Sequence, residues 1–336
     1  MNPALPASHR GSITSVSTPQ GSLAVGHWRP RRSAERPDSP VVVALHGITG
    51  NHRCWTYLAD TLKECRVIAP DLRGRGGSAQ VAGPFGLQTH ADDVIRVLDA
   101  LEIEQAVFVG HSMGGFVATI AAHRHPDRVR SIVLVDGGLP MTREIPADPE
   151  AVSEPVIKHL RRRLQQDFRS VNQAAASWSA HPALIGMWSP VIGDYVSYDL
   201  GGRPPRLHSR VSGEAVTSDA RDVLACAEVR TALEELRHPT QFLVASRGLL
   251  GASPGLYPPE DVAHWLERYP RIQVHPESWL NHYTFVLSRE GGRVVARAVQ
   301  RALAESAPTP RPEHLEGHSH RRRPGVSRQR VQPSFS

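Results

Sequence analysis

Short runs of apolar and β-branched residues recur along this chain of 336 residues, and stretches with helical periodicity lie between several of them. Such runs are typical of strands that are buried on both faces of a sheet. Strands that alternate with helices favour an α/β fold, with a mostly parallel central sheet flanked by helices. The runs occupy residues 41–45, 66–70, 106–110, 131–135, 240–245 and 272–274.

The alternation stops after the strand that ends at Asp136 and resumes close to residue 237. The intervening sequence is helical, irregular and rich in Arg, and it lacks the runs that mark buried strands. We therefore expect a mainly helical cap, residues 139–236, inserted into an α/β core made of residues 41–138 and 237–305.

The two ends of the chain carry its positive charge, which is formally +6 overall. Residues 1–40, an expected hairpin and linker, contain five Arg and two acidic residues. Residues 306–336, an expected disordered basic tail, contain six Arg and two acidic residues. The remainder is close to neutral and the ends have few aromatic residues among their arginines. We therefore expect no nucleic-acid partner, since binding through these ends is the weakest interpretation.

Composition and motifs also disfavour several other classes. Cys54, Cys65 and Cys226 have no C-x-x-C spacing and give no disulfide framework, which suits a reducing compartment. No run approaches the ~18 apolar residues of a membrane-spanning helix, and the N-terminus has no stretch typical of a secretory signal. Zinc-protease, P-loop and dinucleotide motifs are missing. We expect a cytoplasmic protein with no membrane contact, no metal and no cofactor.

A G-x-S-x-G motif, residues 110–114, stands between a predicted strand and a predicted helix. A serine at such a sharp turn adopts a strained backbone, tolerated only because its neighbours are small, and its hydroxyl is presented at the carboxyl edge of the sheet. A helix that begins there also favours developing negative charge. Ser112 is therefore the candidate nucleophile. The plainer alternative is a glycine-rich turn that happens to contain a serine.

Together with this motif, four other segments resemble the α/β-hydrolase family, and the resemblance covers about residues 12–304. It is specific to the family and says nothing of the substrate. It implies that Asp71 and Arg73 hold loops near the pocket instead of taking part in chemistry. The other segments are His46-Gly47, the D-x-R-G-x-G-x-S loop at 71–78, residues 123–129 and Asn281-His282-Tyr283.

The resemblance implies roles for residues near the candidate nucleophile. His282, between the last strand run and the closing helix, is the expected general base. The backbone N–H groups of Ile48 and Met113 are the expected oxyanion hole. The expected substrate pocket is lined by His46, Gly47, Trp55 and His111.

The acid that would orient the base is missing from its usual place, because residues 247–259, after the strand at 240–245, contain neither Asp nor Glu. Asp136 stands at the family's alternative position, after the strand that follows the nucleophile helix. It is the candidate acid, although an Asp at this point can also simply cap a turn. The remaining alternatives are a dyad of Ser112 and His282 alone, or substitution by Glu260, Asp261 or Glu277.

These residues predict acyl transfer to water, with a carboxylic ester as the expected small-molecule substrate. A C–C-bond hydrolase, lactonase, thioesterase or perhydrolase would use the same residues. Ser at position 112 argues against haloalkane and epoxide hydrolysis, which use a carboxylate nucleophile. A different class is a ligand-binding protein that has lost turnover, which only the missing carboxylate favours. Either a monomer or a homodimer is compatible with the sequence.

Overall fold

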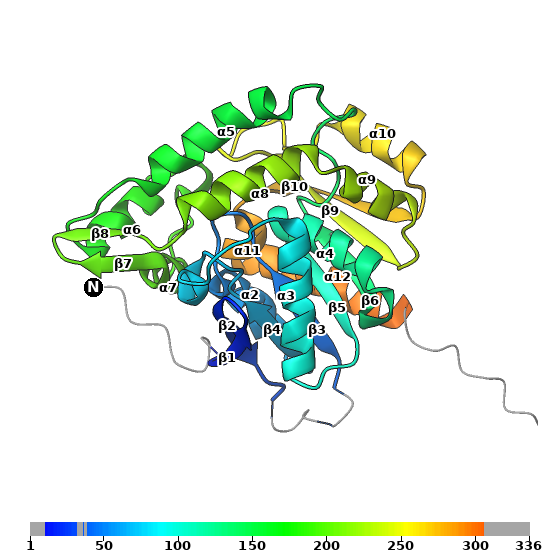
Figure 1. The fold of residues 1–336 in the computed structure, drawn as a ribbon, viewed down its shortest axis with the longest axis horizontal. Helices are drawn as coiled ribbons and strands as arrows, with labels where there is room; N and C mark the ends of the chain where they lie inside the picture. The colour runs from blue at the N-terminus through cyan, green and yellow to red at the C-terminus, as the bar shows by residue number, and fades with distance from the viewer. Residues whose placement is uncertain (1–10, 32–35, 37–38, 306–336) are drawn as a thin grey trace, which may run out of the picture. The chain divides into compact units, whose positions relative to one another are not determined.

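A large, mostly parallel sheet crosses the part of the chain that the computed structural model describes, which is residues 11–31, 36 and 39–305 (Figure 1). Its strand order is β1-β2-β4-β3-β5-β6-β9-β10. The hairpin β1–β2 and the pair β2–β4 are antiparallel, and every other pairing is parallel. The predicted sheet is confirmed. Its strands are β1 (Ser12–Thr18), β2 (Gly21–Trp28), β3 (Val41–Leu45), β4 (Arg66–Pro70), β5 (Ala106–His111), β6 (Val129–Val135), β9 (Thr240–Arg247) and β10 (Ile272–Asn281).

Helices cover both faces of this sheet, because alternate side chains of its central strands point to opposite sides. Val43 and Leu45 of β3 belong to an apolar cluster with α3 and α4, whereas Val42 and Ala44 belong to a second cluster with α2 and α12. The core helices are α2 (Thr56–Thr61), α3 (Leu87–Ala100), α4 (Met113–Arg124), α10 (Pro259–Arg268), α11 (Thr284–Leu287) and α12 (Arg289–Glu305), with short 3-10 turns η1 (His52–Trp55), η2 (Gly76–Ser78) and η3 (Pro126–Arg128).

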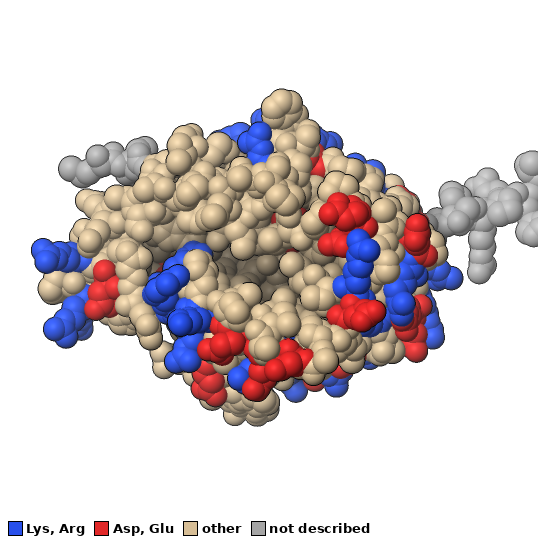
Figure 2. Space-filling view, turned by 90° about the horizontal axis from the view of Figure 1, so that it is seen from above, with Lys and Arg blue, Asp and Glu red and all other residues tan. Residues whose placement is uncertain are grey.

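The segment between β6 and β9, called the cap below, is mainly helical. In Figure 1 its helices α5 and α8 lie across the upper end of the sheet. Seen from that side, Figure 2 shows a hollow surrounded mostly by uncharged residues, with Lys and Arg side chains along one flank. The sequence did not predict the short antiparallel pair β7–β8, because each strand has four residues and little apolar pattern. The elements are α5 (Pro149–Leu164), α6 (Val171–Ser179), η4 (Pro182–Leu184), α7 (Pro190–Asp199), β7 (Leu200–Arg203), β8 (Arg206–Ser209), α8 (Gly213–Ala225) and α9 (Ala227–Glu234).

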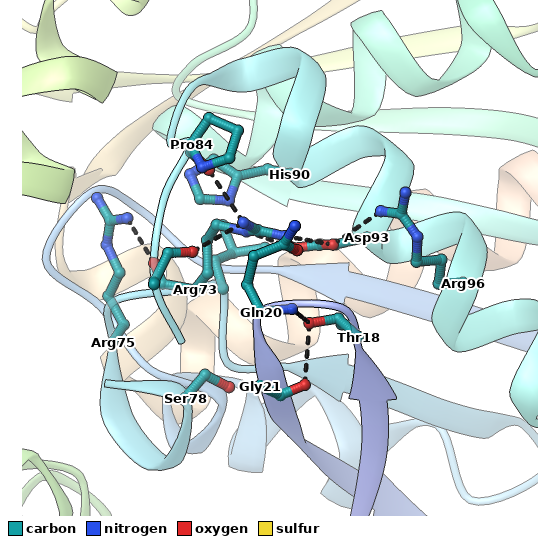
Figure 3. A network of polar contacts seen from close by, with 12 residues as sticks. Thr18, Gln20, Gly21, Arg73, Arg75, Ser78, Pro84, His90, Asp93 and Arg96 are labelled. Carbon is teal, nitrogen blue, oxygen red and sulfur yellow. Dashed lines mark hydrogen bonds and ion pairs between the residues drawn. The ribbon is translucent and has the colours of Figure 1, made fainter. Parts of the chain in front are cut away.

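Arg73, in the loop after β4, is buried and holds several segments together. Its Nε and Nη2 lie 2.7 and 2.8 Å from the two carboxylate oxygens of Asp93 on α3. Its Nη1 donates to the carbonyl oxygens of Ala82 and Pro84, and Gln20 approaches from the β1–β2 turn (Figure 3). A buried guanidinium with all these partners ties the loop to the helix and the hairpin. The loop-holding role implied for Arg73 agrees with these contacts.

Among the described helices, none is both long enough and apolar enough to span a bilayer. The predicted tail, residues 306–336, and part of the predicted linker lie outside the described residues.

Candidate active site

Ser112 occupies a sharp turn between β5 and α4, with φ 54° and ψ −123°. A left-handed φ is strained for a residue with a side chain, so the surroundings must enforce it. They do so from two sides. The Ser112 amide donates to Val135 O of β6 (3.0 Å), and the Ser112 carbonyl accepts from Gly115 N of α4 (2.9 Å). An added Cβ at Gly114 would overlap the Leu45 carbonyl, so only glycine lets the helix start this close to β3. The half-buried Ser112 is thereby presented at the carboxyl edge of the sheet.

The structure brings Asp136 and His282 together. His282 Nδ1 lies 2.7 Å from Asp136 Oδ2, and both side chains are buried. Asp136 is the first residue after β6, also with a left-handed φ of 48°, and its other oxygen accepts from the Ala245 amide at 3.1 Å. A carboxylate satisfied at both oxygens fixes Nδ1 of the imidazole as the protonated nitrogen. The alternative Asp261 instead pairs with Arg143 at 2.8 Å.

Asn281 shapes the turn that carries His282. Its side-chain oxygen accepts from the amides of Tyr283 (3.0 Å) and Thr284 (2.9 Å). Its side-chain nitrogen donates to Ala183 O of η4 at 2.9 Å. In the sequence, Asn281 stands out only as part of a motif, and no role was expected for it. The available signal was an Asn placed just before a short helix, where its side chain caps the exposed amides.

His111 contacts the backbone of His282. Its Nε2 lies 2.8 Å from the His282 carbonyl oxygen, and the two ring centroids are 4.5 Å apart. Burial, together with the neighbouring His282, holds the pKa of His111 well below its usual value. His111 is therefore a neutral donor at physiological pH, buried beneath the turn of the expected base.

The loop after β3 lies against Ser112. A Cβ added at Gly47 would stand 3.1 Å from Ser112 Cβ and 3.5 Å from its Oγ. His46 closes the loop, since its Nδ1 donates to Gly47 O (2.8 Å) and its Nε2 accepts from the Leu72 amide (3.0 Å). Burial lowers the pKa of His46 to about 4, which suits this neutral arrangement. Gly47 and Ser112 therefore lie side by side, and each is followed in the chain by one of the predicted oxyanion donors, Ile48 and Met113.

Buried ionisable side chains hold Ile48, the next residue of the loop after β3. Arg75 Nε donates to Ile48 O at 3.0 Å, and Arg75 Nη2 lies 2.6 Å from Asp219 Oδ2 of α8. The same Asp219 oxygen is 2.9 Å from His90 Nε2 of α3. All three charged or ionisable side chains are fully buried. The position of the predicted oxyanion loop thus depends on a residue of the cap.

Two predicted pocket residues lie deeper than expected. Trp55 is fully buried in the apolar cluster that contains α2 and α12, so its indole packs within the core. His46, also fully buried, is engaged by backbone groups as described above.

A cavity of about 140 Å³ lies between the cap and the loop after β3. Thr49 contributes from the core, and the cap contributes Arg163, Trp178, His181 and Asp199, among others. Across the described residues, no group of three or more His, Cys, Asp or Glu side chains is arranged to hold a metal ion.

Comparison with known proteins agrees with the fold. Residues 40–182 match a family model described as alpha/beta hydrolase fold. The chain is 40% identical over 99 residues to 2-hydroxymuconate semialdehyde hydrolase of Pseudomonas sp. (strain CF600). The aligned stretch covers 28% of this chain and only 35% of that protein. It is 29% identical over 210 residues to Lipase LipV of Mycobacterium tuberculosis, covering 54% of this chain and 79% of the lipase.

A solved structure matches over a longer stretch. The crystal structure of a hypothetical protein from Pseudomonas aeruginosa PAO1 superposes with a TM-score of 0.67 at 25% identity, covering 87% of this chain and 99% of that one. Sheet order, the turn at Ser112 and these similarities agree, and the chain has the α/β-hydrolase fold.

Proposed function

We propose that this protein is a serine hydrolase that cleaves carboxylic esters through an acyl-enzyme on Ser112. The observation that carries the proposal is the 2.7 Å contact between His282 and Asp136 at the same sheet edge as the strained turn of Ser112. A strained serine, an imidazole and a buried carboxylate in the chain order Ser, Asp, His are the groups that such catalysis requires.

Each group has one task in the proposed mechanism. With Nδ1–H donated to Asp136, the Nε2 of His282 is the basic nitrogen and takes the proton of Ser112 Oγ as this oxygen attacks the ester carbonyl. The Ile48 and Met113 amides stabilise the oxyanion. The tetrahedral intermediate then expels the alcohol, which receives the proton from His282. Water, activated in the same way, releases the acid and restores Ser112.

The site also bears on the alternative of a binding protein without turnover. The feature that favoured it was the lack of an acid after β9, and Asp136 after β6 supplies a carboxylate to His282 instead. Among the relatives, the one named a lipase supports an ester substrate. The relative named for 2-hydroxymuconate semialdehyde keeps C–C-bond hydrolysis as the second candidate, with the same three residues.

The first test is hydrolysis of p-nitrophenyl acetate and butyrate by the wild type, Ser112→Ala, His282→Ala and Asp136→Asn. We expect each variant to lose at least ~100-fold in kcat/KM, because loss of a working triad member has at least this effect. Asp261→Asn is the matched control and should keep its activity. If Asp136→Asn stays near the wild type while the other two fail, Asp136 is not the acid. A wild type that neither hydrolyses esters nor is labelled at Ser112 by a fluorophosphonate contradicts the proposal.

A further inference from the structure

Arg163 of α5 is a half-buried cation in the wall of the cavity described above. Its guanidinium carbon lies 4.9 Å from the centroid of the Trp178 ring, on the ring face, and its Nη1 donates to the Tyr283 hydroxyl at 3.2 Å. An aromatic face and a phenol hold the planar guanidinium in one orientation. Several of its N–H groups remain available to a ligand in the cavity.

The cavity borders one loop of the proposed catalytic site, and two residues of its wall contact the other. Tyr283 directly follows His282, and Thr49, in the cavity wall, directly follows Ile48. His181, also in the wall, packs edge-on against Tyr283 with ring centroids 5.1 Å apart. A substrate bound at Ser112 would therefore have this cavity close to one of its two ends.

The charge balance of the cavity favours an anion. In the described part of the chain, no carboxylate lies within ion-pairing distance of Arg163. The acid in the cavity wall is Asp199, and burial raises its pKa to about 7, so near neutrality a large fraction of it is uncharged. Burial and the nearby Arg163 lower the pKa of His181, which is therefore neutral. Arg163 is left as the dominant charge.

We propose that Arg163 is an anion subsite, and that the substrate is an ester whose acyl part carries a carboxylate. The substrate class rests on the serine-hydrolase function proposed above, whereas the anion subsite does not. A carboxylate fits a guanidinium through two parallel N–H···O bonds, which is stronger and more selective than any contact a neutral chain could make. A cavity of about 140 Å³ holds a fragment of roughly six heavy atoms, which points to a short acyl chain.

The test compares esters that differ only in the carboxylate. Monomethyl adipate is paired with methyl hexanoate, and monomethyl glutarate with methyl pentanoate, with acid release followed by titration at pH 6.5. We expect the wild type to have the higher kcat/KM for the charged member of at least one pair. Arg163→Met should lower the charged-to-neutral ratio at least ~tenfold, as loss of a charge-assisted contact predicts.

Arg162→Met is the matched control, because Arg162 is the exposed neighbour on α5 and its side chain contacts His159 outside the cavity wall. It should keep the wild-type ratio. A wild type with no preference for the charged esters, or equal ratios in the two variants, overturns the proposal.

A binding measurement separates this proposal from the proposed function. Calorimetric titration of Ser112→Ala protein with monomethyl adipate and monomethyl glutarate needs no turnover. Binding of either ester that weakens at least ~tenfold when Arg163→Met is added supports the subsite even if no ester is hydrolysed. Equal affinity with and without Arg163, or no binding of either ester, overturns it whatever the activity.

Discussion

At the scale of single residues, Asp199 is the acid in the wall of the proposed anion subsite, where His181 also lies. Its pKa is raised to about 7 by burial, against the opposing effects of a hydrogen bond from Ser209 and the charges of Arg163 and Arg210, while Asp71 raises it further. Below this pH the carboxyl is mostly neutral, and above it the negative charge of the carboxylate weakens the attraction between Arg163 and a substrate anion.

The pH dependence of substrate preference should therefore reveal Asp199. We expect the ratio of kcat/KM for the charged over the neutral ester to fall several-fold between pH 6 and pH 8. Taking the ratio cancels any pH dependence of the catalytic steps that both substrates share. Asp199→Asn should give a ratio that no longer changes with pH. A wild-type ratio that is constant over this interval would show that the charge of Asp199 does not act on the subsite.

At the scale of elements, Asp219 of α8 links the cap to the core, because it lies between Arg75 and His90. We expect Asp219→Ala to lower the free energy of unfolding by about 3–5 kcal/mol, since it leaves Arg75 buried without a counter-charge. Activity should fall as well, because Arg75 also holds Ile48 O. Urea unfolding measures the first effect and ester hydrolysis the second.

Glu214→Ala on the same helix is the control for this prediction. Glu214 is exposed in the first turn of α8, so its removal should change stability by less than about 1 kcal/mol. If the two variants are equally stable, the buried contact does not connect the cap to the core energetically.

The elements differ in how far the sequence predicted them. The strands were predictable because runs such as residues 41–45 are apolar on both faces. The sequence favoured Asp136 as the acid, from its place after the strand that follows the nucleophile helix, but it left Asp261 open because the choice depends on which carboxylate the fold brings to His282. The environment of Arg163 left no sequence signal, because Trp178 and Tyr283 lie near it only in space.

At the scale of the whole molecule, buried ionisable groups make stability depend on pH. His46, with a pKa lowered to about 4 from 6.5 by burial, is neutral in the fold but binds a proton more readily when unfolded. Burial alone would raise the pKa of Asp71, but contacts with His52 outweigh it and lower the pKa to about 2 from 3.8. Because both pKa values are lower in the folded state than in the unfolded state, protonation of either group lowers the free energy of unfolding as the pH falls.

The signs give two windows of pH. The contribution of His46 is fully present above about 6.5 and is lost as the pH falls towards about 4. That of Asp71 is present above about 3.8 and is lost as the pH falls towards about 2. We expect the urea midpoint to decline continuously below pH 6.5, and Asp71→Asn to flatten only the lower window. A midpoint that stays constant from pH 7 to pH 4 would contradict the role given to His46.

The position of Asp136 after β6 has a consequence for how the chain can diverge. The strands that carry Ser112 and Asp136, β5 and β6, are adjacent and paired, so the proposed nucleophile and acid share one rigid support. With Asp136 as the proposed acid, the loop after β9, residues 248–256, carries no residue of the proposed triad. A change of length in that loop would leave the proposed nucleophile and acid in place, so the loop is a site where the specificity of such a chain can change.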